Sequence, residues 1–415
     1  MNLTNISFLG LLVLSVNSFA KDYQIDSCVD LQSIGKGENY PGASHSDAWP
    51  LDGSYYLINN IDCMDIEFDK IAPEEEFPFN GFLDGNDFTI SNVSGKNGIF
   101  GYISFAENKR PNISNLKLSD FNIKANRNYV GVLMDYAQNV FLHDIEISNS
   151  TVINTGDYTG LVGGYVSVPS SLVATHDIVA NQSFVSGGNY TGGVFGRSDG
   201  FTNYIYITNL EINGKNYVGG ISGSHDVSDY IGHLSSKYSN ISGIDYIGGV
   251  FGQFGENTAD GINVAASDHN LIIGSNYVGG LFGKSSSFSN VYVFSTSNIV
   301  SINGDHIGGL YGELDLAYAN NTSVYFSGSV SAASTAKNVG RILGSTTGDV
   351  MLNKAFYYDG QEWFSSVDNN YGEIPAMYDN FLDISWYLDT LGFSSLNWAF
   401  YNPLDVEHGP WMKKE

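Results

Sequence analysis

One stretch of the chain matches a hydrolase motif. Residues 196–200 (Gly-Arg-Ser-Asp-Gly) fit the G-x-S-x-G pattern, in which Ser198 would be the nucleophile. That chemistry needs a sharp turn from a strand into a helix, because the turn lifts the serine hydroxyl above the sheet. Here a strand-like run, residues 202–208, follows the motif. The pattern therefore favours a structural repeat over a hydrolase, and we predict no catalytic residues.

Metal and cofactor signatures are also weak. The 8 histidines are scattered and contain no H-E-x-x-H, and the sequence has no phosphate-binding loop. Calcium stays an alternative because the chain has 44 acidic residues, and Asp84-Gly-Asn-Asp87 could ligate a cation. Such a string is more often a tight turn, and no EF-hand spacing is present. We therefore predict no cofactor and no metal site.

Polysaccharide cleavage is the other chemistry to weigh. A lyase acting on uronates needs Arg or Lys near the reacting carbon, and the four arginines lie far apart in the sequence: Arg110, Arg127, Arg197 and Arg341. A glycosidase needs two carboxylates about 5–10 Å apart in one cleft. Since Asp and Glu are plentiful, the sequence leaves a polysaccharide-degrading enzyme open as an alternative.

The charge excludes one class of partner, and the first 20 residues indicate an exported protein. The formal charge of −26 over 415 residues excludes a nucleic-acid binder, which needs clustered Lys and Arg. Residues 6–16 form an apolar run, and Ser18-Phe-Ala20 offers a small-x-small cleavage site. We predict a signal peptide over residues 1–20, with an uncleaved anchor as the alternative. No later apolar run is long enough to span a membrane.

The two cysteines fit export. Cys28 and Cys63 both lie in the N-terminal section, and we predict that they form a disulfide. Two unrelated buried thiols are the alternative. A metal site is disfavoured because two cysteines this far apart have no histidine partner nearby.

A repeat of about 30 residues must position any functional side chain. Its motif is Asn/Asp-Tyr-x-Gly-Gly-x-x-Gly, as in residues 276–283. The aromatic recurs in seven copies, as Tyr129, Tyr158, Tyr190, Tyr217, Tyr246, Tyr277 and His306. Between the copies lie short alternating runs of β-branched and aromatic residues, typical of strands. Several strands per repeat predict an all-β parallel β-solenoid of about nine coils.

Stacking of the coils would place the motif residues in ladders. We expect the glycine pairs, for example Gly249, to adopt positive φ at a corner of the coil. The Asn or Asp before the aromatic would tolerate a left-handed turn. A structural ladder of aromatic rings is the simpler interpretation, and an exposed stripe that binds sugar rings or a partner surface is the alternative.

The motif Tyr-Val-Gly-Gly-Leu-Phe-Gly, residues 277–283, resembles the GLUG repeat of bacterial secreted and surface proteins. The resemblance covers residues from about 80 to 345 and implies a right-handed parallel β-helix. The family includes adhesins and some extracellular peptidases, and it supplies no catalytic residues. Val132 and Arg341 stand where the second glycine is usual, and His306 replaces tyrosine.

These observations divide the chain into four parts. We predict a signal peptide at 1–20, an N-terminal cap at 21–90, the repeats at 91–350 and a C-terminal cap at 351–415. Caps are expected because an open solenoid end exposes unpaired strand edges. The function predicted is a non-catalytic secreted or cell-surface module for adhesion, binding or a stalk. Its expected partners are glycans or host and matrix surface proteins.

Overall fold

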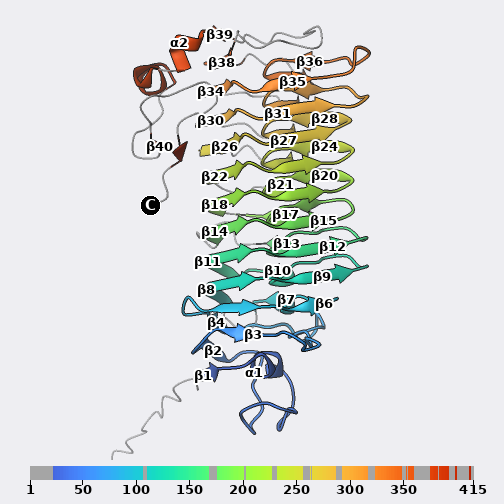
Figure 1. Ribbon diagram of the computed structural model, residues 1–415, viewed down its shortest axis with the longest axis vertical. Helices are drawn as coiled ribbons and strands as arrows, with labels where there is room; N and C mark the ends of the chain where they lie inside the picture. The colour runs from blue at the N-terminus through green and yellow to red at the C-terminus, as the bar shows by residue number, and fades with distance from the viewer. Residues whose placement is uncertain are drawn as a thin grey trace, which may run out of the picture.

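The computed structural model is a tall stack of β-coils (Figure 1). It describes residues 22–105, 110–167, 175–200, 202–226, 231–255, 262, 264–286, 292–315, 323–347, 352, 354–358, 374–381, 383–391, 398–399 and 411–412. The predicted signal peptide lies outside these residues. Among them, no helix is long and apolar enough to cross a bilayer.

Each complete coil contributes one strand to each of several parallel sheets, which we number 1 to 4 in chain order. Sheet 1 contains β1 (Asp22–Ile25), β2 (Ser54–Leu57), β4 (Phe82–Asp84), β8 (Asn112–Ser119), β11 (Phe141–Ser148), β14 (Thr175–Asn181), β18 (Thr202–Thr208), β22 (Gly232–Lys237), β26 (Val264–Asp268), β30 (Tyr292–Ser295), β34 (Ser323–Phe326), β38 (Ala355–Tyr358) and β39 (Ile374–Ala376), with β3 (Ile61–Asp62) and β5 (Thr89–Ser91) beside them.

Sheet 2 follows in the coil. It contains β6 (Ser94–Gly95), β9 (Asn122–Ala125), β12 (Thr151–Asn154), β15 (Phe184–Ser186), β19 (Glu211–Asn213), β23 (Asn240–Ser242), β27 (Leu271–Gly274), β31 (Asn298–Ser301) and β35 (Ser329–Ser331). Sheet 3 is shorter and contains β16 (Thr191–Gly192), β20 (Asn216–Gly219), β24 (Asp245–Gly248), β28 (Asn276–Gly279), β32 (Ile307–Gly308) and β36 (Val339–Gly340).

Sheet 4 closes each coil. It contains β7 (Phe100–Ser104), β10 (Met134–Gln138), β13 (Gly163–Ser167), β17 (Phe195–Asp199), β21 (Ser222–Asp226), β25 (Phe251–Phe254), β29 (Phe282–Ser285), β33 (Tyr311–Leu314) and β37 (Leu343–Thr346). In the part of the chain that the structure describes, sheets 2 and 4 have 9 strands each, which agrees with the predicted number of coils. The prediction of a parallel β-solenoid is confirmed. Its right-handedness stays a prediction, because strand pairing does not test it.

Apolar side chains point inward and stack on their equivalents in the next coil. Ile205 pairs with Leu234 in sheet 1, and Ile212 pairs with Ile241 in sheet 2. All four are at most 1% exposed. A single coil cannot bury this face alone, so the free energy of folding is shared between neighbouring coils.

The glycine pairs do not turn the corner, and that prediction is wrong. Gly248 and Gly249 are not among the residues with positive φ. The aromatic residue of the motif takes the left-handed conformation instead, with φ between 55° and 66° from Tyr129 to His306. Glycine is needed because the backbone is crowded: a Cβ on Gly249 would lie 2.0 Å from the Ser267 Oγ and 2.2 Å from the Gly280 carbonyl oxygen.

The N-terminal section continues sheet 1 and holds the disulfide. β1 pairs with β2, and β2 with β4, so the parallel stacking already begins before residue 91. Helix α1 (Cys28–Ser33) begins at an N-cap, Ser27, whose hydroxyl accepts from the Asp30 amide. Cys28 at the start of α1 is bonded to Cys63, as predicted.

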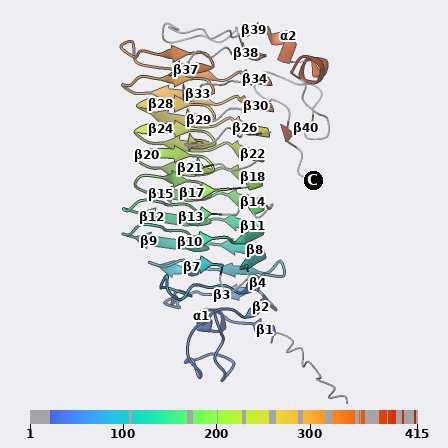
Figure 2. The same cartoon turned by 180° about the vertical axis from the view of Figure 1, so that it is seen from behind.

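The C-terminal section packs against the outside of the solenoid (Figures 1 and 2). It contains α2 (Tyr378–Phe381), a π-helical turn η1 (Trp386–Thr390), and an antiparallel pair, β40 (Trp398–Ala399) with β41 (Trp411–Met412). Trp386 and Tyr387 join a second hydrophobic cluster with Phe294, Tyr325 and Phe356 of sheet 1. Alternate residues of the last strands, such as Val324 and Phe326, face the main core.

Candidate binding surface

Seven aromatic side chains form one continuous ladder along the solenoid. Neighbouring ring centroids lie 4.5–4.8 Å apart, from Tyr129 through the intervening tyrosines to His306. The planes of Tyr158 and Tyr190 differ by 2°, and those of Tyr129 and Tyr158 by 22°. The spacing equals the distance between paired strands, so the ladder follows directly from the stacking of coils.

Stacking changes what the ladder can present to a ligand. Each ring is half-buried, and both faces of an internal ring are covered by its neighbours, which leaves edges and hydroxyls outward. Burial raises the pKa of Tyr158, Tyr246 and Tyr277, so these hydroxyls remain protonated at neutral pH. The ladder therefore suits hydrogen bonding along its length better than the stacking of sugar rings on its faces.

A second column of side chains lies beside the ladder on the outer face of sheet 4. Tyr136 contacts Tyr129 edge to face at 5.3 Å and stacks on Tyr165 at 4.8 Å. Register then places Arg197 next to Tyr165. Arg197 pairs with Asp199 at 3.3 Å and with Asp226, and the Tyr165 hydroxyl donates to Asp199 at 2.6 Å. These two carboxylates are therefore held by partners within the column.

A similar cluster of charged side chains lies beside His306, at the C-terminal end of the ladder. Lys284 pairs with Glu313 at 2.9 Å and with Asp315 at 3.6 Å. Glu313 also lies 3.8 Å from His306, the last ring of the ladder. Burial opposes charge on Lys284, but the nearby Glu313 and Asp315 carboxylates raise its pKa overall.

Ser198 of the G-x-S-x-G match is buried and faces inward. It is 2% exposed, and its hydroxyl lies 2.7 Å from Nδ1 of His225, which is 0% exposed. Its Oγ also lies 3.2 Å from Ser222 Oγ, which donates to the Ser224 carbonyl at 2.7 Å. A consistent chain runs from His225 Nδ1–H through Ser198 and Ser222 to that carbonyl. Ser198 then donates away from the imidazole, opposite to a nucleophile activated by histidine.

His225 makes folding stability depend on pH. Burial lowers its pKa from 6.5 to about 4. The contribution of this imidazole to the free energy of unfolding is complete above pH 6.5 and is lost as pH falls towards 4. The reason is that His225 binds a proton at a higher pH in the unfolded chain than in the folded one. We expect this group to contribute a loss of about 3 kcal/mol between pH 7 and pH 4.

The measurement is chemical denaturation at several pH values for the parent chain and for His225→Leu. The difference between the two pH profiles isolates this imidazole from the acidic residues. Parallel profiles would show that His225 is not buried in its neutral form.

Asp135 is a buried, ion-paired carboxylate that the analysis of the sequence did not single out. It stands where the other copies have the last glycine of the motif. The strand register supports this alignment, because Met134, the residue before Asp135, pairs with Gly163. It is 6% exposed and is held by Lys70 and by Arg127 at 3.0 Å. Burial raises its pKa against the effect of both cations. Asp135 thus ties the N-terminal section to the coils, and comparison of the motif copies would have found it.

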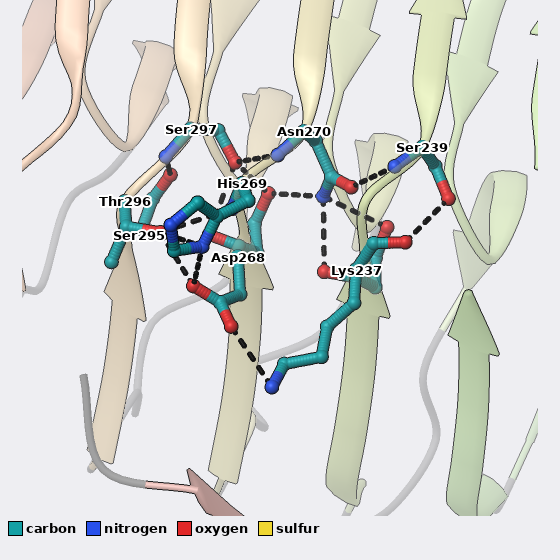
Figure 3. A network of polar contacts seen from close by, with 10 residues as sticks. Lys237, Ser239, Asp268, His269, Asn270, Ser295, Thr296 and Ser297 are labelled. Carbon is teal, nitrogen blue, oxygen red and sulfur yellow. Dashed lines mark hydrogen bonds and ion pairs between the residues drawn. The ribbon is translucent and has the colours of Figure 1, made fainter. Parts of the chain in front are cut away.

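A polar network lies at the C-terminal ends of neighbouring strands of sheet 1, β22, β26 and β30 (Figure 3). Lys237 and His269 contact opposite oxygens of Asp268, at 2.9 Å and 2.7 Å, and Thr296 donates to Asp268 at 2.6 Å. Burial of Asp268 opposes its charge, but the bonds from His269, Lys237 and Thr296 lower its pKa overall. The carboxylate is 3% exposed, so it anchors three coils together and is not placed to meet a substrate.

Beside this network, buried Ser and Asn side chains join successive coils (Figure 3). Asn270 accepts from the Ser239 amide at 2.8 Å, and Ser297 Oγ accepts from the Asn270 amide at 3.2 Å. Each side chain thereby satisfies a backbone N–H at the corner between sheets 1 and 2. This column of Ser and Asn side chains is structural.

The string at residues 84–87 forms a turn. Asp84 Oδ1 accepts from the Asn86 amide at 2.8 Å and from the Asn115 side chain at 3.1 Å. Asn86 and Asp87 both have positive φ. In the described part of the chain, no group of three or more acidic, His or Cys side chains is arranged to hold a metal ion.

No family model matches the chain, and no curated protein matches it. A solved structure named "putative immunoglobulin A1 protease" from Bacteroides ovatus is similar at 11% identity and a TM-score of 0.35, covering 92% of this chain and 90% of that one. The fold assignment rests on the strand pairing described above.

Proposed function

We propose that this chain is an exported, non-catalytic β-helical module of the GLUG-repeat type that binds glycans or matrix proteins at a cell surface. The observation that carries the proposal is the ladder from Tyr129 to His306. It presents near-equivalent aromatic edges on consecutive coils at a spacing of 4.5–4.8 Å. Weak contacts repeated along a rigid axis add up to avidity when one extended ligand engages several at once.

The polar groups that could do chemistry have structural roles, which supports binding over catalysis. Ser198 is buried, and the carboxylates of Asp199, Asp226 and Glu313 are engaged with Arg197 or Lys284. Glycoside hydrolysis needs two carboxylates facing one cleft. An open groove among the described residues is lined by a single carboxylate, Glu211. A polysaccharide-degrading enzyme remains the second candidate.

Graded substitution of the ladder tests the proposal. Asparagine is the suitable replacement, because Asn338 occupies the equivalent left-handed position, φ 54°, in the last copy of the motif. We expect Tyr217→Asn to weaken binding modestly. Replacing Tyr217, Tyr246 and Tyr277 together should weaken it far more than the three single effects suggest.

Binding is measured on immobilised glycans and matrix proteins with the mature chain. Tyr217→His is the matched control, since His306 already stacks in the ladder at 4.5 Å. Denaturation curves must show that each variant is folded. A folded triple variant that binds as well as the parent would contradict the proposal.

A further inference from the structure

An open groove runs along the corner between sheets 1 and 2, away from the aromatic ladder. Its volume is about 640 Å³, and it spans four successive coils, from β11–β12 to β22–β23. With coils about 4.8 Å apart, its length is roughly 14 Å, enough for a few linked sugar rings.

Two columns of side chains form the walls of the groove. The corner residue of each coil has positive φ, between 48° and 54°, and this column reads Asn149, Gln182, Asn209 and Tyr238. Two residues later, the first outward residue of sheet 2 forms the other column: Thr151, Phe184, Glu211 and Asn240. The intervening residues, such as Ser150 and Ser183, point inward and are at most 6% exposed.

The chemistry of the walls is that of a site for sugar hydroxyls. Among the described residues, the side-chain amides of Asn149, Gln182, Asn209 and Asn240 make no hydrogen bond to the protein. Each offers two donors and an acceptor, which matches vicinal hydroxyl groups. Tyr238 is 44% exposed, and together with Phe184 it supplies aromatic surface within the same groove.

We propose that this groove binds a neutral oligosaccharide, an inference that rests on the proposed binding function and adds a second site to the aromatic ladder. The groove has no Lys or Arg in its walls, and the chain carries a charge of −26, so uronate, sulfated and sialylated glycans are disfavoured. A peptide cannot join it by strand addition, because the strands of sheets 1 and 2 that border it are paired on both sides.

The test uses substitutions that neighbouring coils already make. Phe184→Thr copies Thr151, and Tyr238→Asn copies Asn149 and Asn209 at the same left-handed corner. The probe is an array of neutral, sialylated and sulfated glycans, followed by calorimetry with the neutral hexasaccharide that is retained best. We expect each substitution to weaken that binding about fivefold to tenfold.

A control variant sharpens the result. Asn122→Ala, in the same outward column but outside the groove, should leave affinity unchanged.

The possible outcomes separate this inference from the broader proposal. Preference for anionic glycans, or binding untouched by Phe184→Thr and Tyr238→Asn, would overturn the groove assignment. If the triple ladder variant alone loses binding, the proposed function stands and the groove inference fails. If the array and the matrix proteins both retain nothing, both fail.

Discussion

Valine at position 249 should destabilise the solenoid by several kcal/mol, a large fraction of a typical folding free energy. A Cβ there would meet the Ser267 Oγ at 2.0 Å and the Gly280 carbonyl oxygen at 2.2 Å. The carbonyl belongs to the backbone of the next coil and cannot rotate away, so the coils must separate locally. The cost is one of overpacking, since the φ angle of Gly249 is not in the left-handed region.

Thermal and chemical denaturation measure this effect directly. Gly37→Val is the matched control, because a Cβ at that glycine meets no atom within 4 Å. We expect the control to unfold with the parent chain, and Gly249→Val to unfold well before it. Equal midpoints for the two variants would show that the coils are not packed this closely.

Removing the disulfide should have the second large effect. Cys28 and Cys63 are 35 residues apart, and both are at most 2% exposed. Closing a loop of this length restricts the unfolded chain, and loop-entropy arithmetic gives about 3–4 kcal/mol. We therefore expect the double variant Cys28→Ser/Cys63→Ser to unfold at much lower denaturant concentration.

The pairing itself is checked by intact-mass measurement after alkylation without reduction. No alkylated cysteine is expected in protein purified without a reductant. Two alkylated thiols would contradict the bond. Reduction of the parent chain is the matched control, and it should reproduce the loss of stability seen in the double variant.

The ladder could be predicted because its information is local and repeated. A tyrosine that recurs about every 30 residues in a strand-rich chain must stack once each repeat becomes one coil. The conformation of the motif was harder to predict. A glycine can be required either by a positive φ or by the close approach of another backbone. Only the packing of Gly249 against Gly280 shows that close approach is the reason here. Tyrosine rarely adopts a positive φ, so residue propensity alone would have assigned the left-handed position to glycine or asparagine.

Contacts between coils could not be predicted in the same way. Ser198 and His225 are 27 residues apart in sequence, and their hydrogen bond depends on the register of β17 against β21. The groove is likewise a product of register, since Phe184 and Tyr238 line one groove only when their coils are aligned. Trp386 and Tyr387 cover the outside of sheet 1, a placement that composition near the C-terminus does not specify.

We propose above all that this chain binds polysaccharides without cleaving them. The most direct measurement incubates the purified chain with a panel of neutral and acidic polysaccharides. Retention on the polysaccharide and the mass spectrum of released fragments are then recorded for the same sample. We predict retention with no fragments above the control without protein. Release of defined fragments, abolished by replacing a single Asp or Glu in a variant that remains folded, would contradict the claim.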